Sequence, residues 1–164
     1  MNTIVLNSRQ IEQKIQRIAY EILENNFESE IIFLFGIKGN GFILARELSE
    51  ILLKISDQKI ITGEITVNKH EPLSEPITSD VDLSQTRNHT VILVDDVINS
   101  GKTMQYALIK LLEQPLKRIK TVALVDRKHR RYPIRCDYVG LTLSTTLQER
   151  VEVSLEDKKE AYLV

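Results

Sequence analysis

The stretch "VILVDDVINSGKTM" (91–104) decides the fold, because it contains three kinds of segment in a row. Four apolar residues run into two adjacent acids, Asp95 and Asp96, and a small polar turn follows. A short apolar run that stops at polar residues is typical of a strand buried on both faces of a parallel sheet. The pattern after the turn predicts a helix over 103–113. A strand, a turn and a helix form the unit from which α/β folds are built.

The segments on either side repeat this unit. Four isoleucines at 11, 15, 18 and 22 form one apolar stripe, which predicts an amphipathic first helix. Strands are predicted at 31–36, 59–67, 91–94 and 120–125, and a further helix at 41–55. Their alternation predicts an α/β domain with an open, Rossmann-like parallel sheet and right-handed crossovers. A chain of 164 residues suits one domain, so we expect a single domain over 1–164.

Composition excludes several classes of protein. With 22 Lys and Arg against 23 Asp and Glu, the net charge of −1 gives no overall attraction to nucleic acid or membranes. The single cysteine, Cys136, excludes an internal disulfide framework, and we expect it to be a small buried apolar residue. The start "MNTIVLNSRQ" lacks the apolar stretch of a signal peptide, and no apolar run could span a bilayer. We therefore expect a cytoplasmic protein without a membrane partner.

The polar segment 68–88 separates two predicted strands. It carries two of the four prolines and shows no clear periodicity. A long loop in a compact domain is usually functional or mobile, and a disordered surface connection is the alternative.

The two acids and the turn after them suit a phosphorylated sugar. Ligands of open parallel sheets bind at the carboxyl ends of strands, where Asp95 and Asp96 are expected. Adjacent carboxylates repel each other and point to opposite faces of a strand, so they add little stability. The hydroxyls of Ser100 and Thr103, the charge of Lys102 and the free N–H groups of a helix N-terminus suit a phosphate.

Two other phosphate-binding motifs do not fit. A P-loop needs a glycine five residues before Gly101, where this chain has Asp96. The glycines of "GIKGNG" (36–41) stand at offsets of three and five, whereas a dinucleotide fingerprint needs two and five.

The stretch 91–104 resembles the phosphoribosyl-pyrophosphate signature of type I phosphoribosyltransferases. "LFGIKGNGFILARELSE" (34–50) is similar to the strand, pyrophosphate loop and helix of that family, and "VALVDRKHRRYPIRCDYVG" (122–140) to its base-binding hood. "HEPL" (70–73) and "ERVEVSL" (149–155) resemble the subfamily of pyrimidine-operon attenuators that are also uracil phosphoribosyltransferases. The resemblance implies a type I phosphoribosyltransferase fold with a small hood. It also implies a glycosyltransferase of nucleotide salvage that moves the phosphoribosyl group to a nucleobase, uracil.

The resemblance also implies roles for particular residues. Asp95 and Asp96 would hold the ribose 2′ and 3′ hydroxyls and, with Lys38, form the catalytic set. Lys38 and Gly39 would contact pyrophosphate, after a non-proline cis peptide between Ile37 and Lys38. The 5′-phosphate would bind Asn99, Ser100, Gly101, Lys102 and Thr103.

Further implications concern the base, the metal and the assembly. Arg127 and the backbone near Val139 would frame the nucleobase. Mg²⁺ would neutralise the leaving pyrophosphate and would be held mostly by ligand oxygens and water, without a dedicated metal ligand in the chain. The resemblance implies a homodimer or a higher assembly.

Three departures from the subfamily leave alternatives open. Asn40 stands in the pyrophosphate loop where an arginine is usual, which removes one cation from the substrate site. Asn99 replaces an aromatic residue, and purine-using relatives carry an aspartate there. The 68–88 loop is short and lacks a tyrosine-arginine-acid cluster, for which Arg87 or Lys69 could substitute. A purine phosphoribosyltransferase, and a regulator that binds nucleotide and RNA with little turnover, therefore remain alternatives.

Two polar features favour simpler interpretations. The basic run "RKHRR" (127–131) contains no aromatic residue and is more typical of a solvated loop than of an RNA site, so RNA binding is not favoured. His70, His89 and His129 lack the spacing of metal ligands.

Overall fold

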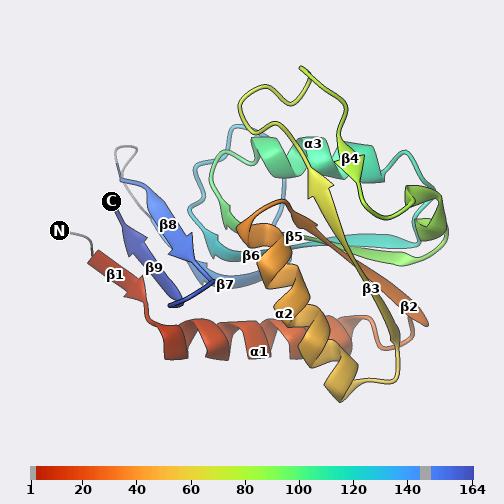
Figure 1. The fold of residues 1–164 in the computed structure, drawn as a ribbon, viewed down its shortest axis with the longest axis horizontal. Coiled ribbons are helices and arrows are strands. Elements are labelled where there is room, and N and C mark those ends of the chain that lie inside the picture. The colour runs from red at the N-terminus through yellow and green to blue at the C-terminus, as the bar shows by residue number, and fades with distance from the viewer. Residues whose placement is uncertain (1–2, 145–148) are drawn as a thin grey trace.

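The computed structural model describes residues 3–144 and 149–164, which form two sheets and three α-helices (Figure 1). The larger sheet has six strands in the order β4-β3-β2-β5-β6-β7. All of its pairs are parallel except the edge pair of β3 and β4. The strands are β2 (Ile31–Ile37), β3 (Lys59–Thr66), β4 (Thr78–Ser79), β5 (Thr90–Ile98), β6 (Arg118–Asp126) and β7 (Tyr138–Thr142). The predicted α/β class with an open, mostly parallel sheet is confirmed.

Helices cover both faces of this sheet. The helices α1 (Ser8–Asn25) and α2 (Asn40–Ile55) lie on one face, and α3 (Lys102–Leu111) lies on the other (Figure 1). Along β2, Ile32 and Leu34 join the core of α1 and α2, whereas Phe33 joins the core of α3. Because successive strand residues point to opposite faces, a continuously apolar strand supplies both cores.

The helix α1 begins at a cap that the sequence encodes. Oδ1 of Asn7 accepts a hydrogen bond from N of Gln10, and Oε1 of Gln10 accepts one from N of Asn7. This capping box provides partners for N–H groups at the start of the helix. The four isoleucines of the predicted stripe are buried, so the amphipathic first helix is confirmed.

The smaller sheet forms a hood beside the carboxyl end of β5. It contains β1 (Thr3–Leu6), β9 (Glu160–Leu163) and β8 (Val151–Ser154), paired antiparallel in the order β1-β9-β8. The strand β8 contacts β5. A small hood was predicted, but the assignment of 122–140 to it is wrong, since that segment forms β6, a loop and β7 of the large sheet.

Some boundaries differ from the prediction. The strand β5 continues through Asp95 and Asp96 to Ile98, because β6 pairs with it along that length. The segment 68–88 holds the strand β4 and a 3-10 helix, η1 (Leu83–Thr86), so it is not a structureless loop. No helix in the described ranges has both the length and the apolar character to cross a bilayer.

Candidate functional site

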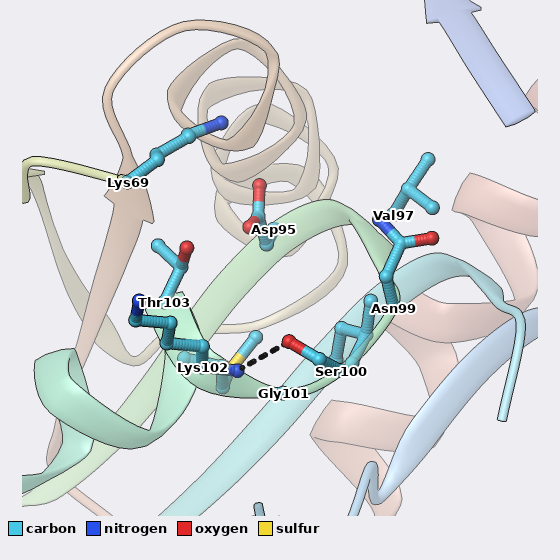
Figure 2. Close-up of a pocket in the computed structure, with 10 residues that line it drawn as sticks. Lys69, Asp95, Val97, Asn99, Ser100, Gly101, Lys102 and Thr103 are labelled. Carbon is cyan, nitrogen blue, oxygen red and sulfur yellow. Dashed lines mark hydrogen bonds between the residues drawn. The ribbon is translucent and has the colours of Figure 1, made fainter. Parts of the chain in front are cut away.

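A cavity of about 120 Å³ lies at the carboxyl end of β5 (Figure 2). Its wall combines the end of this strand, the start of α3 and one residue from the loop after β3. The lining residues are Lys69, Asp95, Val97, Ile98, Asn99, Ser100, Gly101, Lys102, Thr103 and Met104. The structure therefore brings the predicted residues Asp95 and 99–103 to one cavity.

Residues 99–103, called the 99–103 turn below, lead the chain from β5 into α3. Gly101 has a φ of 86°, and a Cβ atom on it would lie 2.3 Å from Cγ2 of Ile134. Glycine is therefore required there by both backbone and space. Oγ of Ser100 accepts a hydrogen bond of 3.3 Å from N of Lys102 (Figure 2). The helix thus begins at the cavity wall, where its first N–H groups lack partners within the helix.

Part of the basic run holds the 99–103 turn from outside. Nη1 of Arg130 donates to O of Asn99 at 3.0 Å, and backbone N of Arg131 donates to O of Ser100 at 2.9 Å. The expectation of a solvated basic loop is wrong for Arg130, because its guanidinium is bonded within the protein.

Asp95 is a nearly buried acid, with 5% of its surface exposed. Its Oδ1 accepts a hydrogen bond of 2.9 Å from N of Asp96. Burial, and then the Asp96 carboxylate, raise the pKa of Asp95 well above its usual range, whereas the Lys69 ammonium opposes this rise. An acid held beside a second acid in a buried position suits a ligand that brings hydroxyl donors or positive charge.

Asp96 is connected to the hood through Asn40. The Asp96 carboxylate accepts hydrogen bonds from N of Val97 at 2.8 Å and from Nδ2 of Asn40 at 3.1 Å. The same Nδ2 donates to O of Val153 in β8 at 2.7 Å. Asn40 therefore joins an acid of the site to the hood.

The turn between β2 and α2 passes directly beside Asp95. A Cβ atom on Gly41 would lie 2.9 Å from O of Val94 and 3.0 Å from Oδ1 of Asp95. Glycine at this position lets the turn approach the acid closely.

Lys38 and Gly39 are exposed in this turn, and they do not line the cavity. Gly39 has a φ of 99°, with no atom within 4 Å of a Cβ on it other than its chain neighbours. The described residues contain no cis peptide bond, so the cis bond expected before Lys38 is wrong.

Lys69 reaches the cavity from the loop after β3, and its ammonium extends toward Asp95 in Figure 2. Oδ1 of Asn68 accepts hydrogen bonds from N of His70 at 3.1 Å and N of Glu71 at 3.0 Å, which shapes the turn around Lys69. Nζ of Lys102 donates to O of His70 at 3.0 Å. The loop that carries Lys69 is therefore bonded to the start of α3.

Of the two cations considered for this loop, only Lys69 lies at the cavity. Arg87 follows η1 and precedes β5, so it lies at the amino end of the strand whose carboxyl end forms the site.

Arg127 lies beside Asn99 and is 6% exposed. Its Nη1 donates to Oδ1 of Asn99 at 2.7 Å, and its Nη2 donates to the backbone O of Glu149. Burial lowers the pKa of Arg127, and the Glu149 carboxylate opposes this effect. Arg127 thus links the 99–103 turn to the segment that enters β8.

Val139 lies in a different environment from Arg127. It belongs to β7, and its O accepts a hydrogen bond from Arg17 of α1. It does not line the cavity.

The remaining candidate groups are the histidines and Cys136. His89 packs near Phe33, with 5.9 Å between ring centroids. In residues 3–144 and 149–164, no group of three or more His, Cys, Asp or Glu could hold a metal ion. Burial raises the pKa of Cys136 to about 12.

Comparison with known families gives one match over most of the chain. The family model of the phosphoribosyl transferase domain matches residues 1–157. The bifunctional protein PyrR of Macrococcus caseolyticus is 34% identical over 170 residues, covering 98% of this chain and 97% of that protein. The bifunctional protein PyrR of Staphylococcus aureus is 36% identical over 172 residues, with the same shares covered.

Solved structures share the fold at lower identity. The hypoxanthine phosphoribosyltransferase of Trypanosoma cruzi superposes with a TM-score of 0.79 at 18% identity, covering 97% of this chain and 95% of that one. A hypoxanthine-guanine phosphoribosyltransferase of Bacillus anthracis has a TM-score of 0.73 at 21% identity, covering 87% and 82%.

Proposed function

This chain belongs to the phosphoribosyl transferase domain family and is a phosphoribosyltransferase, and from that premise we propose that its nucleobase substrate is uracil. The resemblance of 70–73 and 149–155 to uracil-using attenuator proteins supports this choice, as do the PyrR relatives that match nearly the whole chain. The reaction forms a bond between C1′ of the ribose and N1 of uracil while the bond from C1′ to pyrophosphate breaks.

One observation carries the proposal: the nearly buried carboxylate of Asp95 and the N-terminus of α3 meet at one cavity, and the carboxylate of Asp96 is its neighbour on β5. Asp95 and Asp96 accept the ribose 2′ and 3′ hydroxyls, whose donors add to the hydrogen bonds that these acids accept from the backbone and from Asn40. The 99–103 turn binds the 5′-phosphate through backbone N–H groups and the hydroxyls of Ser100 and Thr103. These contacts fix the position of C1′ relative to the incoming base.

The donor set fits Mg²⁺, which this family generally uses with phosphoribosyl pyrophosphate. The two carboxylates lie together, and both burial and the charge of Asp96 disfavour the ionised form of Asp95. A cation beside the pair would offset this unfavourable negative charge. Mg²⁺ is commonly held by one or two carboxylates together with substrate phosphates and water. When bound with the substrate, it supplies charge that neutralises the departing pyrophosphate.

The pyrophosphate has cationic and backbone donors on two sides. The exposed Lys38 and Gly39 lie in the turn before α2, and Lys69 approaches from the loop after β3. Where an arginine is usual, this turn has Asn40, whose side-chain amide is bonded to Asp96 and Val153. We infer that Lys69 supplies the cation that the loop otherwise lacks.

A panel of nucleobases with phosphoribosyl pyrophosphate and Mg²⁺ tests the proposal, with nucleotide formation as the readout. We expect uridine 5′-monophosphate to form faster than any purine nucleotide. Faster transfer to hypoxanthine or guanine would make the chain a purine enzyme. Tight binding of the substrate without any product would favour the regulator.

The double change Asp95→Asn, Asp96→Asn tests the site itself. Each charge-assisted hydrogen bond contributes roughly 1.5–3 kcal/mol, so calorimetric titration should show a loss of affinity for phosphoribosyl pyrophosphate of at least about 10-fold. The matched control is Asp57→Asn, Asp157→Asn, which removes two exposed acids and should leave affinity unchanged. Unchanged affinity in the first variant would contradict the assignment.

We also propose a homodimer or higher assembly. Exposed apolar side chains on α3, directly after it and on the nearby loop support it: Ile109, Leu112 and Leu73. Sedimentation velocity across a range of protein concentrations tests it, and a monomer throughout would overturn it.

A further inference from the structure

The side chain of Asn40 uses both of its N–H donors within the protein. Asn40 is the first residue of α2, and its Nδ2 donates to Oδ2 of Asp96 at 3.1 Å and to O of Val153 at 2.7 Å. An amide nitrogen carries two N–H donors, so both are occupied. To donate to a pyrophosphate, Asn40 would have to break one of these bonds. Its amide is therefore committed to Asp96 and to the hood.

The bond from Asn40 determines how the Asp96 carboxylate is oriented. Oδ1 of Asp96 accepts from backbone N of Val97 at 2.8 Å, and Oδ2 accepts from Asn40. The terminal torsion of an aspartate has only a broad preference, so one hydrogen bond alone would leave the carboxylate free to turn. Donors at both oxygens fix its plane. The acceptor sites that remain on the two oxygens then point in fixed directions.

The hood fixes the Asn40 amide in turn. Val153 lies in β8, which pairs with β9 and contacts β5. A backbone carbonyl can only accept, so the nitrogen of the amide, and not its oxygen, faces Val153. The amide therefore bridges an acid of the large sheet and a carbonyl of the small one, with its orientation set by both.

We propose that Asn40 is a positioning residue, which holds the Asp96 carboxylate against the hood in the orientation that accepts a ribose hydroxyl. This inference rests on the proposed function, because it takes the ribose hydroxyls to bind Asp95 and Asp96. Asn40 itself contacts no substrate and acts through Asp96. Its removal should therefore weaken only ligands that offer hydroxyls to this acid.

The variant Asn40→Leu tests the inference, since leucine has nearly the same size and no donor. Uridine 5′-monophosphate and its 2′,3′-dideoxy analogue, which lacks both ribose hydroxyls, are titrated calorimetrically without Mg²⁺. We expect affinity for uridine 5′-monophosphate to fall about 10-fold and that for the analogue to stay within about 2-fold of wild type. Asn25→Leu, at the exposed last residue of α1, is the matched control and should change neither affinity. An equal loss for both nucleotides, or no loss for either, would overturn the inference.

A double-variant cycle gives a second readout. Asp96→Ala removes the carboxylate that Asn40 positions, so it should by itself lower the ratio of the two affinities. Adding Asn40→Leu should then lower this ratio no further, whereas independent effects would add and would overturn the inference. If Asn40→Leu does not fold, Asn40→Asp takes its place, because an acid suits the first turn of a helix and carries acceptors in place of the donors. It should give the same selective loss.

The result does not depend on the choice of base. A wild type that binds inosine 5′-monophosphate but not the uridine nucleotide would show that the choice of uracil is wrong. The inosine nucleotide and its own 2′,3′-dideoxy analogue would then decide the role of Asn40. A wild type that binds neither nucleotide would contradict both proposals.

Discussion

At the scale of single residues, the burial of Asp95 makes stability depend on pH. The folded pKa of Asp95 is raised above its ordinary value of 3.8. At pH values between these two, the folded protein keeps a proton that the unfolded chain has lost, so stability falls as pH rises through this interval. Above the folded pKa, the full cost of the buried charge remains.

Asp95→Asn should therefore stabilise the protein at neutral pH. We expect a gain of at least about 1 kcal/mol in the free energy of unfolding at pH near 7, shrinking as pH falls toward the unfolded pKa. Urea unfolding across this pH range measures it, with Asp57→Asn as an exposed control. A loss of several kcal/mol at neutral pH would instead mean that the carboxylate supports the fold.

Residues that are close in the chain were predictable, and those joined only by folding were not. Asp95, Asp96 and the 99–103 turn form one contiguous stretch, so their chemistry is visible in the sequence. The link from Asp96 through Asn40 to Val153 joins three distant segments, and an asparagine in a turn gives no signal of such partners.

At the scale of elements, the junction of β5 and α3 depends on Gly101. Gly101→Ala places a Cβ against Ile134 and keeps a positive φ, so we expect a loss of about 2–4 kcal/mol in stability. Gly39→Ala is the control, since its φ is also positive but its surroundings are open; it should cost about 1–2 kcal/mol. Thermal unfolding compares them, and equal losses would show that Ile134 does not matter.

We expect the cation of the loop after β3, Lys69, to contribute to turnover more than to substrate binding. Lys69→Met should lower kcat about 30- to 1000-fold, the effect of losing one charged contact that tightens in the transition state. Lys69→Arg should restore much of the rate, and Lys54→Met on the exposed end of α2 should not change it. Product assays at saturating substrate measure these rates, and a Lys69→Met variant as active as wild type would exclude the role.

Element identity followed from periodicity, but element ends depended on neighbours. The apolar stripe of α1 and the run at 31–36 were sufficient to identify a helix and a buried strand. The strand β5 extends past the acids because β6 pairs with it as far as Ile98, and single-chain patterning contains no information on that partner.

At the scale of the whole molecule, Cys136 reports on unfolding. A pKa raised from 9.0 to about 12 reduces the thiolate fraction near neutral pH about 1000-fold. We expect iodoacetamide to label the native protein slowly and the urea-unfolded chain rapidly, with the midpoint of labelling at the midpoint of unfolding. Fast labelling without denaturant would show that the region around β7 opens by itself.

The hood was the part of the molecule least visible in the sequence. Its three strands are four residues each, and β1 pairs with β9 across more than 150 positions. Short strands carry little periodic signal, and no local pattern reveals a partner so distant.

The separation of β1 and β9 along the chain also determines the order in which the two sheets form during synthesis. While a ribosome produces the chain, the large sheet can assemble as soon as β7 has emerged, but β1 must wait for β9. Closing so long a loop adds an entropic cost that local pairings avoid. The nascent chain therefore has the cavity at the carboxyl end of β5 before it has the hood. The contacts of Asn40 and Arg127 with the hood and the segment that enters it form only in the last steps of synthesis.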